Sequence, residues 1–121
     1  PSAHRIDNAA DGEAYLSRLE QFPTVLDNET AEVRRQAGYG FLAPVWALDL
    51  ALKQMADLRA PTPEQSTLAD SLASRATAKN VAGDWRARAA KIVADQVYPA
   101  LDREIAAVTA LRASSQTAAT A

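Results

Sequence analysis

Few side chains in this sequence could carry out chemistry, and most of those are carboxylates. Glu29 and Glu32 lie three residues apart in a segment with a helical pattern. Further along, Asp102 and Glu104 flank Arg103. Two carboxylates on one helix face can bind a hard cation or share a proton. Arginines nearby in the sequence can instead act as ordinary surface partners for these groups, and we favour that interpretation.

Other reactive side chains are scarce. His4 is the only histidine, and the chain contains no cysteine. A His-Glu-x-x-His zinc site needs two histidines one helical turn apart, so it cannot form here. Without cysteine there are no disulfides, thiol nucleophiles or cysteine-based metal sites. We therefore predict no catalytic residue, no metal ligand and no cofactor within these residues.

Aromatic residues mark places where the chain could contact a cleft or a partner. Tyr39 and Phe41 surround a glycine shortly before Trp46, and glycine permits a tight turn there. Tyr98 precedes a proline, so it could bond carbonyls freed by a helix break or face a neighbouring domain. The candidate cleft or interface contacts are therefore Tyr39, Phe41, Trp46 and Tyr98. A buried helix–helix corner anchored by Phe41 and Trp46 is the alternative.

The elements that position these residues are predicted to be helices. Of the 58 apolar residues, 28 are alanine, which has the highest helix propensity and lets helices approach closely. Valine and isoleucine together number only ten, and no long run alternates as a strand would. The fold class is therefore all-α, a small array of four to five helices whose last member is long and kinked at a proline.

Apolar periodicity and helix-breaking residues predict where these helices lie. The expected helical ranges are residues 11–22, 23–37, 44–59, a weaker helix after Thr62, and 85–112. Pro23 is expected to divide the first two, and Thr62 and Asp84 are expected N-caps. Pro99 should kink the last helix or divide it in two. Residues 1–112 would form one helical domain or part of a larger one, and residues 113–121 a frayed, low-complexity tail.

Charge and hydropathy exclude two classes of partner. The net charge is −2 and the sequence pI is about 5.3, whereas a nucleic-acid-binding domain usually has a basic patch and a high pI. No stretch approaches the ~18 consecutive apolar residues of a membrane helix. The chain begins at Pro1 without a charged and apolar leader, so we expect a removed leader or a piece of a longer protein.

Residues 14–23 have the sequence AYLSRLEQFP. They resemble the YLxRLxxFP segment of a bacterial family, the domain of unknown function 885. Residues 38–44, GYGFLAP, are similar to its G-x-x-x-G-x-x-x-P region, although the first spacing here is Gly-x-Gly. Residues 97–101, VYPAL, resemble its V-x-P-A-[YL] helix. The resemblance extends from about Asp7 to Thr120.

The resemblance implies a role without catalysis. Family members are longer, resemble zinc metallopeptidases, and often carry export or lipoprotein signals. Their expected metal-binding motif lies downstream and has no counterpart here, so no metal ligand carries over. The resemblance thus implies an N-terminal helical segment of a periplasmic or lipoprotein-anchored parent, with zinc bound elsewhere in that parent. Its partners would be the remainder of the parent chain, or a second copy through exposed apolar helix faces. The alternative function is an autonomous helical protein–protein interaction module.

Overall fold

The computed structural model describes residues 5–40 and 43–120, with side chains as far as residue 114. The described residues form helices and no strands, which confirms the all-α prediction. In chain order the elements are α1 (Ala9–Gly38), α2 (Val45–Arg59), a 3₁₀ turn η1 (Pro63–Gln65), α3 (Thr67–Ala78), α4 (Trp85–Ile92), a π turn η2 (Val93–Val97) and α5 (Tyr98–Thr120).

The first helix is continuous, and the expected division at Pro23 is wrong. Pro23 lies inside the 30-residue α1, where it removes one backbone hydrogen bond. Leu19 and Leu26, on either side of the proline, belong to one buried stripe and share the same apolar core. Packing along the whole stripe holds the helix together, because tertiary contacts stabilise most protein helices more than local propensity does.

Side chains cap two of the helix starts, and neither of them is an N-cap expected from the sequence. Asn8 caps α1 by accepting from the Asp11 backbone amide at 2.9 Å. Ser66 caps α3, accepting from the Ala69 amide at 3.1 Å, whereas Thr62 precedes only the 3₁₀ turn and makes no cap bond. Asp84 also makes no side-chain cap bond, since its ψ of 52° departs from the extended backbone of an N-cap.

The last element is one long helical rod with an irregular turn in its middle. The π turn η2 directly precedes α5, whose second residue is Pro99, and the Tyr98 amide donates back to the Val93 carbonyl. A proline has no amide hydrogen for the carbonyl four residues earlier, and a π turn accommodates that loss. The predicted irregularity at Pro99 thus takes the form of a π turn. Helix α5 continues to Thr120, beyond the end expected at Arg112.

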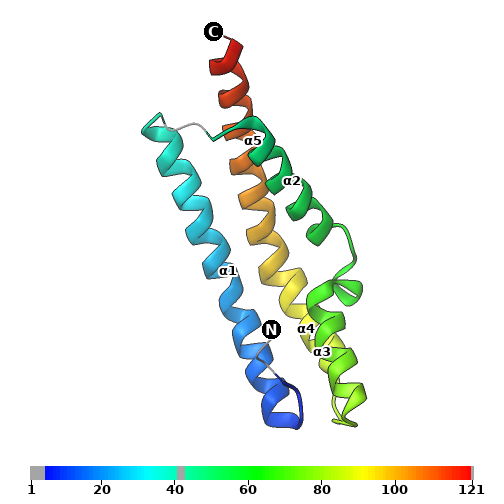
Figure 1. Cartoon of the computed structure of the whole chain (residues 1–121). Coiled ribbons are helices and arrows are strands. Elements are labelled where there is room, and N and C mark those ends of the chain that lie inside the picture. The colour runs from blue at the N-terminus through cyan, green and yellow to red at the C-terminus, as the bar shows by residue number, and fades with distance from the viewer. Residues whose placement is uncertain (1–4, 41–42, 121) are drawn as a thin grey trace.

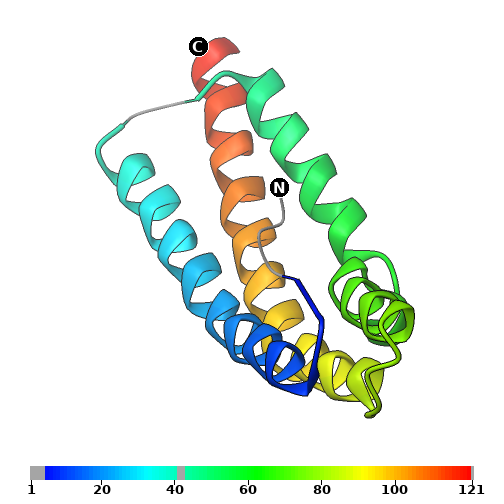
Figure 2. The ribbon, with the colours of Figure 1, turned by 60° about the horizontal axis from the view of Figure 1, so that its bottom comes forward.

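Three rods make up the fold (Figure 1). Helix α1 runs up the molecule, α2 and α3 run down in succession, and α4 with α5 runs up again. Figure 2 shows α5 between α1 and α2. The extensive packing is that of α1 against α5, α2 against α5, and α3 against α4. The long third rod is therefore the element on which the other helices are assembled.

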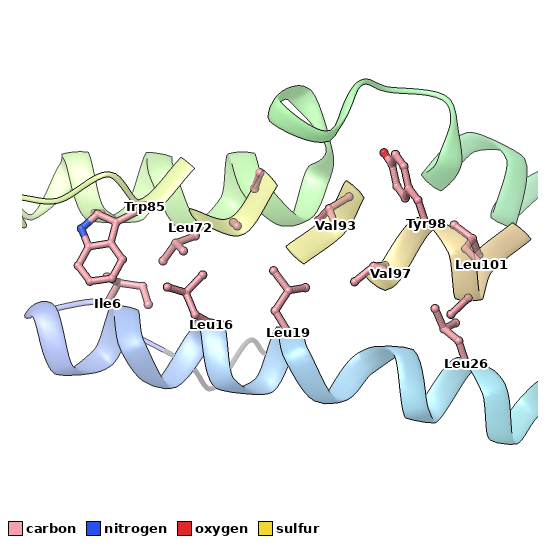
Figure 3. Packing of buried hydrophobic residues seen from close by; sticks show 14 residues of the cluster. Ile6, Leu16, Leu19, Leu26, Leu72, Trp85, Val93, Val97, Tyr98 and Leu101 are labelled. Atoms are coloured by element: carbon pink, nitrogen blue, oxygen red, sulfur yellow. The ribbon is translucent and has the colours of Figure 1, made fainter. Parts of the chain in front are cut away.

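The main core lies where the first half of α1 packs against α3, α4 and the start of α5, and Figure 3 shows its side chains. Leu16, Leu19 and Leu26 of α1 face the apolar side chains of the other two rods. Leu72, Val93 and Val97 are fully buried at 0% exposure. A second, smaller cluster of Leu48, Val108 and Leu111 joins α2 to the upper half of α5. The apolar core is thus larger at the lower end of the molecule than at the upper end.

Arginine–carboxylate pairs connect neighbouring rods at the surface. Their nitrogen–oxygen distances are 2.6–2.9 Å. The pairs are Arg88–Glu13, Arg103–Asp27, Arg59–Asp102, Arg112–Asp49 and Arg86–Asp70. Water screens exposed pairs, so they favour one helix register and add little to stability.

Substitutions at two glycines of α1 test the close contact between this helix and Trp85. A Cβ atom at Gly12 would lie 2.7 Å from the ring of the buried Trp85, whereas a Cβ atom at Gly38 would meet nothing within 4 Å. We expect Gly12→Ala to lower the free energy of unfolding by about 1–3 kcal/mol through overpacking. The control Gly38→Ala should raise it by at most about 1 kcal/mol through helix propensity. Urea unfolding measures both, and a stabilising Gly12→Ala would contradict the packing described here.

Candidate functional site

The exposed aromatic candidates lie at the upper end of the molecule. Tyr39 follows the last residue of α1 and is 74% exposed. Trp46 lies in the first turn of α2 and is 71% exposed, so it does not anchor a buried corner within the described residues. Phe41 and the lone His4 lie outside the described residues. A cleft or interface role for Tyr39 and Trp46 stays a prediction.

Tyr98 lies in the core of the protein and not at its surface. Its side chain is buried, and its hydroxyl donates to the Pro61 carbonyl at 2.8 Å, with the Leu58 carbonyl at 3.3 Å. The guanidinium of Arg59 lies 4.3 Å from the ring centroid. Figure 3 shows the ring directed toward the segment that follows α2. Tyr98 therefore fastens the end of α2 to the third rod, and does not bond the carbonyls near Pro99.

The apolar surface of α2 is the first candidate site. Trp46 and Leu50 are four residues apart, so they lie on one face of the helix. Leu50 is 50% exposed, while Leu48 on the opposite side is buried against α5. We call Trp46 and Leu50 the α2 apolar face. A pair of large exposed apolar side chains on one helix face is a suitable contact for another protein surface.

A carboxyl pair between α1 and α5 is the second candidate site. Glu104 of α5 is only 8% exposed, and its Oε1 atom is buried without a hydrogen-bond partner among the described residues. The Glu29 carboxyl group of α1 lies close enough to hydrogen-bond the Glu104 side chain. Carboxylates are almost never fully buried unless they are paired with a cation or hydrogen-bonded. The pair is therefore the most unusual polar feature of the described structure.

Two polar side chains next to the pair in the sequence have other partners. Arg103 is next in sequence to Glu104, yet it pairs with Asp27 at 2.9 Å and holds the pKa of that carboxyl below its usual range. The hydroxyl of the buried Thr30 donates to the Leu26 carbonyl at 3.0 Å. Neither side chain thus serves the Glu104 carboxyl group, and the closest titratable partner is another acid.

Burial and the adjacent Glu29 together raise the pKa of Glu104 to about 7. Removal from water disfavours the charged carboxylate, and a second carboxyl group at hydrogen-bond distance adds to this effect. Near neutral pH the pair can therefore hold one proton between two carboxyl groups. The sequence pattern grouped Glu29 with Glu32 and Glu104 with Asp102, whereas the fold brings together one member of each group.

The acidic pair consists of two carboxyl groups. Within the described ranges, no group of three or more His, Cys, Asp or Glu side chains could hold a metal ion. Two carboxyl groups that share a proton also differ from the three or more protein ligands of a typical zinc site. Across the same ranges, none of the helices has the length and hydropathy needed to span a membrane.

The geometry defines an all-helical domain of three rods with an acidic pair between two of them. Residues 1–120 match the family described as "Bacterial protein of unknown function (DUF885)". The chain belongs to this family, as its sequence motifs predicted. No curated protein and no solved structure matched it.

Removing the buried acid should change how stability depends on pH. In the folded chain the pKa of Glu104 is about 7, above its ordinary value of 4.5. The protonated carboxyl group therefore contributes fully to stability below pH 4.5, and this contribution is lost as the pH rises through 7. Between these values the chain should lose about 3 kcal/mol from this group alone. We expect Glu104→Gln to remove that loss, as measured by urea unfolding at acidic, neutral and mildly alkaline pH.

Two matched variants define the outcome. Glu29→Gln should weaken the pH dependence, because it removes the second carboxyl group, whereas the exposed Glu20 of α1 should be replaceable by Gln without effect. If Glu104→Gln and Glu20→Gln show the same pH dependence, the carboxyl pair does not hold a proton in the folded chain.

Proposed function

We propose that this chain is a non-catalytic N-terminal helical segment of an extracytoplasmic, zinc-metallopeptidase-like protein. In that parent it supports or walls a cleft whose catalytic part lies outside these residues. The observation that carries the proposal is the α2 apolar face, with Trp46 and Leu50 exposed by 71% and 50%. Burying apolar surface is favourable by roughly 25 cal/mol per Å2, so a neighbouring part of the parent would gain from covering this face.

The surroundings of the α2 apolar face support this proposal. Asp49 is paired with Arg112 of α5, and Lys53 is paired with Asp57 one turn along α2. These charges are compensated within the chain and demand no partner. What remains for a partner to bury is mainly apolar, which is typical of permanent contacts between parts of one protein.

The position of the face also fits the wall of a cleft. Tyr39 and Trp46 lie at the two ends of the short connection between α1 and α2, and both are exposed. Ligand sites often occur at the junction between domains, where aromatic side chains contribute contact area. In this proposal any zinc is held by the remainder of the parent, as the family resemblance implies.

An autonomous interaction module is the second candidate function. It is favoured by the continuous apolar core, which runs from Ile6 to Leu101 and is buried by the chain's own helices. A chain with its own core can fold independently and present the α2 apolar face to a separate protein. The two functions differ in what covers that face.

Hydroxyl-radical footprinting can distinguish them. We expect Trp46 and Leu50 to be modified readily in the isolated chain and to be protected at least several-fold within the parent protein. The internal control is Trp85, which is 5% exposed and should stay protected in both samples. Equal modification of Trp46 in both samples would contradict the proposal and favour the interaction module.

Zinc and peptide assays test the absence of catalysis. We expect the isolated chain to bind no stoichiometric zinc in a titration and to cleave no peptide, because catalytic zinc needs about three protein ligands at one place. The parent protein should bind zinc under the same conditions. Tight 1:1 zinc binding or peptide turnover by the isolated chain would overturn the proposed role.

A further inference from the structure

A groove of about 430 Å3 lies between α1 and α3. Its apolar lining consists of Tyr15, Leu19, Phe22, Val25 and Leu68. The α1 members follow one another at three- and four-residue spacing, so they form a single stripe along the helix. The volume is near the small end of the roughly 300–1,000 Å3 typical of ligand pockets.

One hydrogen bond holds the two walls together. The Tyr15 hydroxyl donates to the Leu68 carbonyl at 2.8 Å, across 53 residues of sequence. Burial raises the pKa of Tyr15, so the phenol stays neutral and remains a donor at physiological pH. The groove is therefore formed in the chain by itself and needs no ligand to order its walls.

Two arginines line the same groove. Arg18 of α1 is exposed and makes no ion pair with any residue in the described ranges, although most other arginines there do. Arg75 of α3 lies near enough to Tyr15 to act on the phenol electrostatically. The whole chain has a net charge of −2, so any attraction for an anion is local to this groove. An apolar floor beside arginines is complementary to an apolar ligand with one anionic end.

We propose that this groove binds an aliphatic carboxylate, such as a medium-chain fatty acid. The chain lies along Leu19, Phe22 and Val25, and the carboxylate meets the guanidinium of Arg18. Arginine and carboxylate form strong, paired hydrogen bonds because their planar geometries match. The groove has room for a single extended alkyl chain.

The proposal accounts for the exposure of Val25. This residue is 48% exposed on a helix whose neighbouring apolar positions are covered by other helices. An aliphatic chain in the groove would cover it, and would do so without any change in the backbone.

Isothermal titration calorimetry with sodium decanoate, below its micelle concentration, tests this site on the full chain. We expect saturable 1:1 binding. Decanol has the same chain without the charge and should bind about tenfold more weakly, because a hydrogen bond to a charged group is lost. Arg18→Gln should weaken decanoate binding by about tenfold or more for the same reason.

The matched control is Arg34→Gln. Arg34 is also exposed, also on α1 and outside every described ion pair, but it does not line the groove. Circular dichroism establishes that both variants keep the helical fold. Equal affinity of Arg18→Gln and Arg34→Gln for decanoate would overturn the proposal. Equal affinity for decanol and decanoate, or uptake that never saturates, would overturn it as well.

Discussion

The packing of the α1 apolar stripe along the third rod is the interaction on which the rest of this structure depends. Leu16, Leu19 and Leu26 share one core with Val93 and Leu101 (Figure 3). This contact keeps α1 continuous through Pro23. It also fixes the register that places Glu29 opposite Glu104, and it leaves the outer side of α1 to form the groove with α3. The carboxyl pair and the groove are therefore both consequences of how α1 and the third rod meet.

The core is unevenly distributed along the rods. The lower half is filled by the larger apolar cluster, with Leu72 and Val93 excluded from solvent. In the upper half, α2 is held by the smaller cluster around Leu48 and Val108. The acidic pair lies between α1 and α5, and an acid buried without a cation costs stability when it is ionised. The exposed Trp46 is at this less apolar end, where additional contacts from another part of a protein would add most.

Sequence reasoning succeeded where local chemistry decides and failed where packing does. The all-α class and the helix expected over residues 44–59, observed as Val45–Arg59, followed from composition, periodicity and proline positions. Pro23 was read as a boundary because local propensity opposes a proline within a helix, and a stripe of buried leucines overrode it. Thr62 and Asp84 have the right side chains for N-caps, but Thr62 precedes only the 3₁₀ turn and the backbone of Asp84 departs from that of an N-cap.

For the candidate sites, the sequence by itself determined which reactive side chains are present: several carboxylates, one histidine and no cysteine. Its motifs also predicted the family, which the comparison with known families confirmed. The sequence also identified Tyr39 and Trp46 as residues of interest. Only the tertiary structure decided that Glu29 meets Glu104, that Tyr98 is buried, and that Arg18 borders an apolar groove. The reason is physical, since helix periodicity places residues only relative to their own helix. Which faces then meet depends on the packing of distant helices against one another.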